Sequence, residues 1–164
     1  MGYYIQAIAS TQSALESRAT DFSSAVVVPL ASGLALVPLT AELLDEIGAS
    51  GASGQFEKFT PAVAYWLRTV SDSAPAAYIE AEFFGGIGSQ SATVWERGEQ
   101  ILAPFHDRDA INIALRLFHI SRGAFRDEFE AVGLPRHRNT DDWLADAIPK
   151  NSSASSETGI SDHR

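Results

Sequence analysis

Two β-hairpins in succession constrain the fold of this sequence more than any other feature, and they occupy residues 76–102. From Tyr78 to Phe84, apolar and polar side chains alternate, which is the two-residue period of a strand with one buried face. A glycine-rich turn (residues 85–88) then interrupts the strand, and Arg97-Gly98 offers a second reversal. The segment therefore predicts a three-stranded antiparallel meander.

The register of the first hairpin follows if its turn is centred on Gly86 and Ile87. This register places Ile79 opposite Val94, so that both strands agree on the apolar face. The second reversal then places Val94 opposite Ile101, which extends the apolar face to a third strand.

The other face of the meander carries polar and aromatic side chains, which we expect to be at least partly exposed to water. In the same register, Tyr78 and Trp95 lie opposite one another beside two carboxylates. The members of this face are Tyr78, Glu80, Glu82, Thr93 and Trp95.

The rest of the chain reads as strands and helices that cover or extend the meander. Thr40 and Thr60-Pro61 are strong helix starts, because threonine caps a helix and proline suits its first position. We expect strands over residues 3–9, 25–30 and 33–38, and helices over 14–22, 40–47, 60–70, 107–120, 124–132 and 140–147. This order predicts an α+β domain with a mainly antiparallel sheet, a central β-meander and helices packed on one face.

Composition adds limits on the domain organisation and the cellular location. We expect a single domain over residues 1–148, followed by a polar, serine-rich tail (149–164) that is disordered. The segment from Gly48 to Gln55 reads as a flexible loop. The chain has no cysteine and no run of roughly 20 apolar residues, so we expect a cytoplasmic protein without thiolate metal sites or a membrane span.

The net charge of −9 argues against nucleic acid as a partner, because phosphate binding needs clustered Lys and Arg. Up to Glu57 the only basic residue is Arg18, whereas the segment from Pro104 to Lys150 is nearly balanced in charge. Such a dipolar surface could steer a basic partner. The simpler alternative is that the acidity only keeps the protein in solution.

The glycine-rich turn GGIGSQ resembles a phosphate-binding loop only superficially. A Walker A loop needs a following Gly-Lys-Ser/Thr, and a dinucleotide fingerprint needs a glycine that opens a helix, whereas here a strand follows. We therefore interpret the glycines as hairpin residues. A tight turn that exposes Ile87, Ser89 and Gln90 could still dock closely against a partner.

Glu80 and Glu82 lie two residues apart on one strand, so their Cα atoms are about 6.5–7 Å apart. Two carboxylates at this spacing could share a cation or act as acid and base, as pairs of carboxylates do in glycosidases. They could equally form a solvated face, or bind a basic partner together with Tyr78 and Trp95. No third ligand with a telling spacing accompanies them, so we predict no metal site and no cofactor.

Arg136, His137 and Arg138 form the only dense basic stretch. One interpretation is ion pairing with the nearby carboxylates Asp141 and Asp142. The alternative is a contact surface that this stretch forms together with the glycine turn and the following tryptophan.

Two segments, YIEAEFFGGIGSQSATVW and DEFEAVGLPRHRNTDDW, carry a resemblance to an uncharacterised family of small bacterial proteins. A GG-x-G-x-Q hairpin and a Gly-Leu-x-Arg-His-Arg segment recur in that group, and the similarity covers most of residues 1–147. The resemblance implies a shared fold and brings no catalytic residues. In size, acidity and lack of enzyme motifs, the chain also resembles immunity proteins of bacterial toxin systems, in type only.

The leading hypothesis is a non-enzymatic cytoplasmic binding protein, an immunity or antitoxin-like inhibitor that occludes a basic partner protein with an acidic surface. One alternative is an enzyme or small-molecule-binding protein with a pocket between the meander and the Gly48–Gln55 loop, near Glu80, Glu82 and His106. Another is a structural or homo-oligomeric component that pairs through an edge strand such as Val26–Leu30. The predicted partner-binding residues are Tyr78, Glu80, Glu82, Gln90, Trp95, Arg136 and Arg138.

Overall fold

A six-stranded antiparallel sheet in the order β2-β3-β1-β4-β5-β6 forms the centre of the protein in a computed structural model that describes residues 2–48, 58–85 and 87–150. The strands are β1 (Tyr3–Thr11), β2 (Val28–Pro29), β3 (Leu34–Pro38), β4 (Ala76–Phe84), β5 (Ile87–Glu96) and β6 (Glu99–Asp107). The helices are α1 (Gln12–Ala19), α2 (Ala41–Ile47), α3 (Pro61–Val70), α4 (Ala110–Leu117) and α5 (Glu128–Ala131), with 3₁₀ turns η1 (Leu134–Arg136) and η2 (Thr140–Asp146). The predicted α+β class, antiparallel sheet and meander are confirmed.

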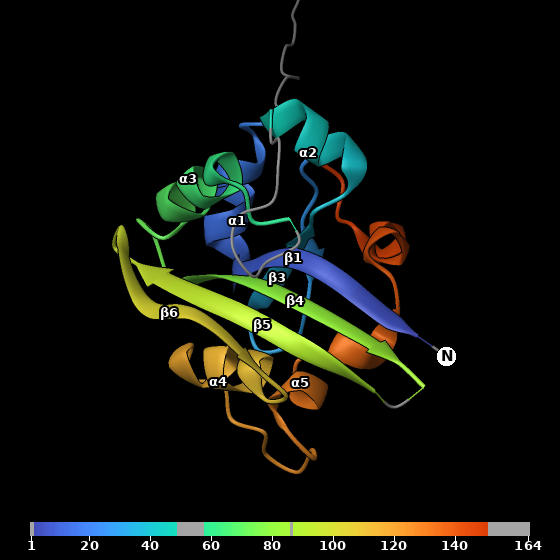
Figure 1. Cartoon of the computed structure of the whole chain (residues 1–164). Coiled ribbons are helices and arrows are strands. Elements are labelled where there is room, and N and C mark those ends of the chain that lie inside the picture. The colour runs from blue at the N-terminus through green and yellow to red at the C-terminus, as the bar shows by residue number, and fades with distance from the viewer. Residues whose placement is uncertain (1, 49–57, 86, 151–164) are drawn as a thin grey trace, which may run out of the picture.

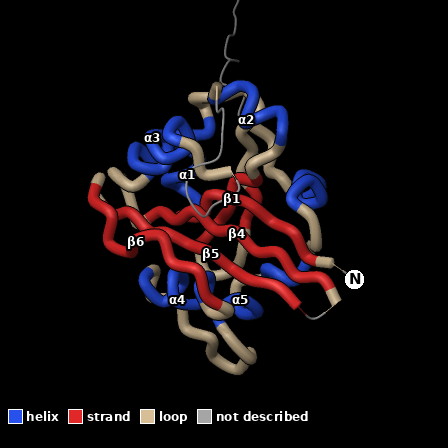
Figure 2. The backbone as a smooth tube through the Cα atoms, viewed as in Figure 1, coloured by secondary structure: helices blue, strands red, loops and turns tan. Residues whose placement is uncertain are grey.

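Helices cover both faces of the sheet, so the prediction that they pack on one face is wrong (Figures 1 and 2). Helices α1, α2 and α3 pack on one face, which we call the first face, and α4 and α5 pack on the second. The reason lies in the inner strands, which carry apolar side chains on both faces, so that each face needs a cover of its own. In β1, Ile5 and Ala7 belong to the core of the second face, and Ile8 belongs to that of the first.

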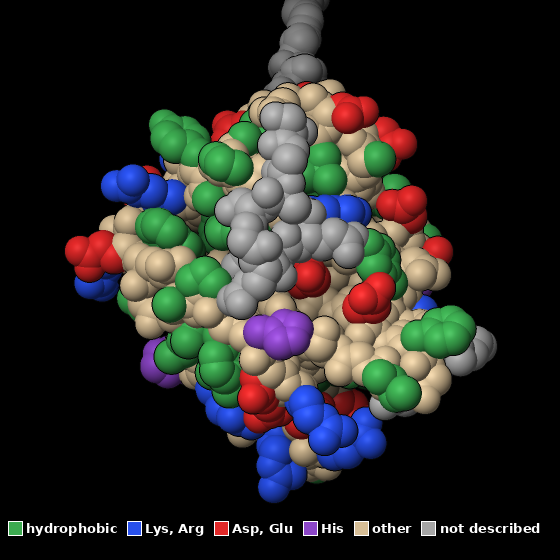
Figure 3. Space-filling view, in the orientation of Figure 1, with side chains coloured by type: hydrophobic (Ala, Val, Ile, Leu, Met, Phe, Trp, Pro, Cys, Tyr) green, Lys and Arg blue, Asp and Glu red, His purple; other side chains and the backbone are tan. Residues whose placement is uncertain are grey.

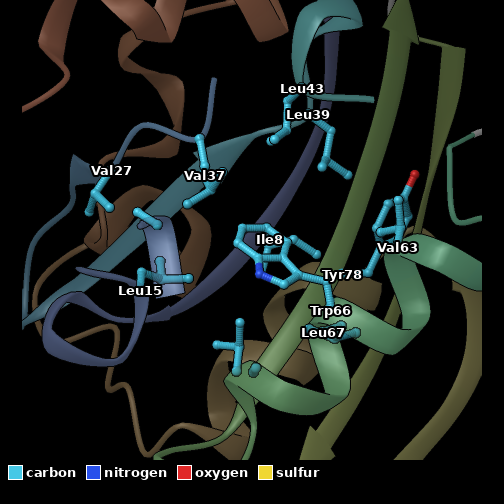
Figure 4. Close-up of a cluster of buried hydrophobic side chains, with 14 of the residues drawn as sticks. Ile8, Leu15, Val27, Val37, Leu39, Leu43, Val63, Trp66, Leu67 and Tyr78 are labelled. Atoms are coloured by element: carbon cyan, nitrogen blue, oxygen red, sulfur yellow. The ribbon is translucent and has the colours of Figure 1, made fainter. Parts of the chain in front are cut away.

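The core of the first face is built from side chains of all three helices that cover it (Figure 4). Trp66 and Leu67 of α3 pack with Ile8 and Tyr78 of the sheet, while Leu15 of α1 fills the other end. On the second face, α4 contributes Ile111 and Leu115, and Trp143 of η2 joins them.

The predicted helix starts at Thr40 and Thr60 are confirmed. The Oγ1 atom of Thr40 accepts a hydrogen bond from the N–H of Leu43, and that of Thr60 accepts one from Val63. These caps set where α2 and α3 begin, and therefore how the chain returns over the first face.

The first hairpin has a different register from the predicted one. Phe84 pairs with Ile87, so every pair is shifted by two residues from the predicted register. Tyr78 therefore lies opposite Thr93 rather than Trp95. A shift of two leaves the same side chains on each face, because the strand period is two.

The second hairpin reverses at Arg97-Gly98 as predicted, with φ of 53° and 77° at the two residues. These positive values are those of a type I′ turn, whose twist matches the flanking strands. Val94 pairs with Leu102 instead of Ile101, because the ladder is irregular on both sides of Val94. Such bulges, and Pro104 within β6, make this exposed edge a poor template for another strand.

Residues 136–148, which we call the C-terminal segment, cover the opposite edge of the sheet. A strand over residues 25–30 was predicted at this edge. Only Val28–Pro29 forms a strand. The carbonyl of Val27 accepts a hydrogen bond from Ile148 N, and that of Pro29 accepts one from the Arg136 guanidinium. These two carbonyls are therefore occupied within the chain. The predicted homo-oligomer through this edge stays a prediction.

Two predicted segments lie largely outside the described residues. Of the Gly48–Gln55 loop, the structure describes only Gly48, which ends α2. Of the tail, it describes Pro149 and Lys150. Within the described ranges, no helix combines the length and the apolar character needed to cross a lipid bilayer.

Candidate functional site

The exposed end of the β4–β5 hairpin is the candidate functional site. Phe84 and Ile87 form the last cross-strand pair before the turn, and they are 79% and 82% exposed. Glu82 is also exposed, two residues before Phe84 on the same strand. We call these three residues, Glu82, Phe84 and Ile87, the hairpin-end surface.

Gly88 and Phe83 hold this end of the hairpin in shape. A Cβ atom on Gly88 would collide with the carbonyl oxygen of Glu82 and would lie 2.6 Å from Cδ1 of Phe83. The Phe83 ring therefore packs across the bare backbone of Gly88, and it meets the Tyr3 ring at a centroid distance of 6.5 Å. With Phe83 held inward, its neighbour Phe84 points to the opposite face and into solvent.

Tyr78 is completely buried, so its predicted place on a water-facing surface is wrong. The Phe59 ring lies 4.9 Å from its ring, and the hydroxyl group accepts a hydrogen bond from Lys58 N (3.2 Å). The same hydroxyl donates to Oε1 of Glu80 (2.7 Å). Tyr78 is buried because the chain returns over the first face of the sheet into α3 and covers this position. The next two positions on the same face of β4, Glu80 and Glu82, are covered less.

Gln90 and Trp95 are also less accessible than predicted. Gln90 is 6% exposed and lies on the second face, where its Oε1 accepts the N–H of Ile111 in the first turn of α4 (2.8 Å). It therefore fixes the start of α4. Trp95 is half-buried against the core of the first face, and its Nε1 is buried without a hydrogen-bond partner in the part of the chain that is described.

The two arginines of the Gly-Leu-Pro-Arg-His-Arg segment have different surroundings. Arg136 binds Oδ2 of Asp146 through Nε (2.8 Å), and its guanidinium lies 5.1 Å from the centre of the Trp143 ring. His137 also contacts Oδ2 of Asp146 (2.8 Å), and this hydrogen bond, with the Arg136 charge, lowers the pKa of Asp146. Arg138 is exposed and makes no ion pair among the described residues, whereas Arg136 has a structural partner.

The two predicted carboxylates share the first face of the sheet but differ in exposure. Glu80 is half-buried, and Tyr78 fixes one of its oxygen atoms. Glu82 is exposed and makes no ion pair in the described ranges. An unpaired carboxylate beside two exposed apolar side chains can contact a partner that is both basic and apolar.

A polar row crosses the first face at the level of Glu80. Gln6 of β1 pairs with Glu80, Glu80 with Ser91 of β5, and Ser91 with His106 of β6. The Oγ atom of Ser91 lies 2.8 Å from Nδ1 of the exposed His106. Sequence spacing missed this row because it depends on the register of three neighbouring strand pairs.

A metal centre gains no support from the geometry. Among the described residues, no group of three or more His, Asp or Glu side chains is placed to hold an ion.

Charged side chains of both signs are spread over the face seen in Figure 3. Acidic side chains lie near α2, over the strands and at the edges, while Lys and Arg side chains gather, together with further acidic ones, at the end of the molecule where α4 and α5 lie. Comparison of the chain with protein-family models, with curated proteins and with solved structures found no match. The resemblance to a bacterial family therefore stays a prediction.

Proposed function

We propose that this protein is a non-enzymatic, cytoplasmic protein-binding module, an immunity or antitoxin-like inhibitor that occludes a basic toxin domain. The observation that carries the proposal is the pair Phe84 and Ile87, two large apolar side chains that are about four-fifths exposed and lie opposite one another at the end of one hairpin. Large apolar side chains that stay this exposed bury little of their area in the core, and partner binding would remove them from water.

Charge supports a basic partner. The chain carries a net charge of −9, and Glu82 next to the apolar pair has no counter-ion in the described ranges. A complementary positive partner would be steered to this face, and its Lys or Arg would meet Glu82 and the edge of Glu80. Tyr78, Gln90 and Trp95 then act as support for the hairpin, and Arg138 remains a secondary candidate for contact.

The test uses a double variant that changes the surface and spares the core. Phe84→Ser/Ile87→Ser removes the apolar pair, and Ile101→Ser on β6, which is 45% exposed, is the matched control. A basic candidate toxin, sought first among the proteins encoded beside this gene, is purified, and its affinity for each variant is measured by calorimetry. We expect the double variant to weaken binding by about 30-fold or more, which is the size of a hot-spot loss, and the control to bind as the wild type does.

Glu82→Lys separates the charge contribution from the apolar one. Loss of steering should slow association mainly at low salt, with little change in dissociation. Equal affinities of all variants and the wild type for the neighbouring protein would contradict the assigned surface. Growth arrest by that protein, relieved by co-expression of the wild type only, would support the inhibitor role.

The polar row of Glu80, Ser91 and His106 favours one alternative, a small-molecule-binding protein or enzyme. The observation behind it is the hydrogen bond between Ser91 and His106, beside a half-buried carboxylate. Thermal unfolding with a panel of metals and metabolites tests it, because a ligand at a hundredfold over its Kd adds about 2.7 kcal/mol of stability. A shift that Ser91→Ala or His106→Gln abolishes would favour this alternative.

A further inference from the structure

The C-terminal end of α1 holds an ammonium group. The Nζ atom of Lys150 donates hydrogen bonds to three backbone carbonyls, of Ala19 (3.1 Å), Phe22 (2.7 Å) and Ser23 (3.1 Å). A primary ammonium has three N–H donors, so these acceptors match it in number. The carbonyl end of a helix also carries a partial negative charge, which stabilises a cation there.

The loop that provides these carbonyls is fixed by another residue. Glu46 of α2 accepts hydrogen bonds from Ser23 N (2.6 Å) and Ser24 N (2.7 Å). It also accepts one from Oγ of Ser23 (3.0 Å). Because the N–H side of the loop is bound to Glu46, the carbonyl side keeps its direction without relying on Lys150 alone.

A cavity of about 380 Å³ lies next to this cluster of carbonyls. Its apolar wall comes from Ala19, Val27 and Ile148. Its polar side chains include Glu16, which lies four residues before Thr20 and therefore on the same side of α1. The cavity thus combines a site for an ammonium group at the three carbonyls, an apolar wall, and the carboxylate of Glu16, which could bind a second ammonium group.

We propose that this cavity binds a small primary aliphatic diamine, and that Lys150 occupies its ammonium position in the absence of ligand. One ammonium group of the ligand takes the three carbonyls, the methylene groups lie against Val27 and Ile148, and the other ammonium pairs with Glu16. Binding therefore displaces Lys150 and loosens the C-terminal segment next to Ile148, whose N–H bonds to Val27 O. The proposal is independent of partner binding at the hairpin end.

Competition with Lys150 decides which amines bind. Lys150 belongs to the same chain, so its effective concentration at the carbonyls is in the millimolar range. A monoamine gains only the contacts that Lys150 already makes. A diamine adds the contact with Glu16, which gives it the advantage.

The test measures thermal unfolding of the full chain with Lys150→Met, which removes the ammonium and keeps the apolar stem. The probes are 1,4-diaminobutane, butylamine and tetramethylammonium, at equal ionic strength. We expect diaminobutane to raise the Tm of this variant saturably, with a midpoint at least tenfold below that of butylamine. Tetramethylammonium has no N–H donor, so it should act only as a salt. The wild type should need a higher concentration of diaminobutane than the variant.

Glu16→Gln in the Lys150→Met background checks the second ammonium position. The advantage of diaminobutane over butylamine should disappear, while Glu42→Gln, a change at an exposed acid on α2, should keep it. If Lys150 has only a structural role, Lys150→Met should have a lower Tm that diaminobutane does not raise in a saturable manner. That result would overturn the proposal. So would an equal response to tetramethylammonium.

Should Lys150→Met fail to fold, amide NMR spectra of the wild type replace it. Diaminobutane should then shift the signals of residues 19–24 and Lys150 in a saturable manner. Signals that stay unchanged would also overturn the proposal.

Discussion

The hydroxyl group of Tyr78 donates a 2.7 Å hydrogen bond to Oε1 of Glu80, two residues further along β4. Tyr78 has no exposed surface, and Glu80 is half-buried. The first face of β4 thus changes from buried to partly exposed within two residues. The buried Tyr78 orients the carboxylate of Glu80. The position of Glu80, next to the hairpin-end surface, is therefore coupled to the packing under α3.

Tyr78→Phe tests this coupling. The change keeps the ring in the core and removes a hydroxyl that bonds both Glu80 and Lys58 N. We expect the free energy of unfolding to fall by about 1 kcal/mol, because the half-buried Glu80 carboxylate and Lys58 N–H both lose a hydrogen-bond partner. Urea denaturation measures the change. Tyr65→Phe, at a position that is 71% exposed, should change it by less than about 0.5 kcal/mol.

Gly88→Ala tests the close approach of the two strands. The added methyl group would meet the carbonyl of Glu82 and the Phe83 ring, so we expect a loss of about 2 kcal/mol or more. Gly85→Ala is the comparison, because its φ of 61° is strained for alanine while its surroundings are open. That change should cost about 1 kcal/mol. A Gly88→Ala protein as stable as the wild type would contradict the described hairpin.

Adding Phe83→Ala to Gly88→Ala separates the two contacts. The ring would be gone, yet the carbonyl of Glu82 belongs to the backbone and stays in place. We therefore expect Gly88→Ala to cost less in the Phe83→Ala background than in the wild type, but still to be destabilising.

The pH dependence of stability should reveal Glu46. Backbone hydrogen bonds from Ser24 and Ser23 lower the pKa of this carboxyl below its ordinary value of 4.5. A lowered pKa in the folded state means that the carboxylate stabilises the fold above the unfolded pKa, and that this stabilisation is lost as the pH falls through the folded pKa. Glu46→Gln should therefore be less stable than the wild type near pH 7, with a difference that shrinks below about pH 4.

Thermal unfolding between pH 3 and pH 8 measures this effect. A constant difference between Glu46→Gln and the wild type across the range would refute the assigned role.

Arg116 and Glu128 join α4 to α5. The guanidinium lies 3.2 Å from Oε2 of Glu128, a residue that is only 7% exposed. This hydrogen bond with Arg116 lowers the pKa of the Glu128 carboxyl. Arg116→Met should cost about 1–2 kcal/mol, less than a fully buried pair, because the Arg116 side chain is half-exposed.

A double-mutant cycle with Glu128→Gln isolates the pair. We expect a coupling free energy of about 1 kcal/mol, since Arg116 also contacts Asp109 at 3.4 Å and keeps part of its contacts in the single variant. Additive losses would show that the two side chains do not interact in solution.

Local chemistry predicted several parts of the fold correctly. Thr40 and Thr60 cap helices where the sequence placed them, and Arg97-Gly98 reverses the chain as expected. Each of these features depends on a few neighbouring residues, so it can be read from a short segment. The positive φ values at Arg97 and Gly98, for example, satisfy a turn within four residues.

The candidate site was only partly predictable, because the exposure of its residues depends on segments far away in the sequence. Alternation placed Glu80 and Glu82 on one face, and the structure agrees. The exposure of Phe84 was overlooked, although its position beside a glycine turn was a usable signal. The burial of Tyr78 had no such signal, because it results from a helix that starts 17 residues earlier in the chain.

The sequence by itself determined the alternation of the strands, the helix starts and the antiparallel meander. Only the tertiary structure decided which rows of the sheet are covered, because α3 returns over Tyr78 while α4 lies over Gln90 on the second face. Side-chain period assigns a residue to a face, and it carries no information about which distant helix will pack there. Burial of apolar area between segments far apart in the chain makes that choice.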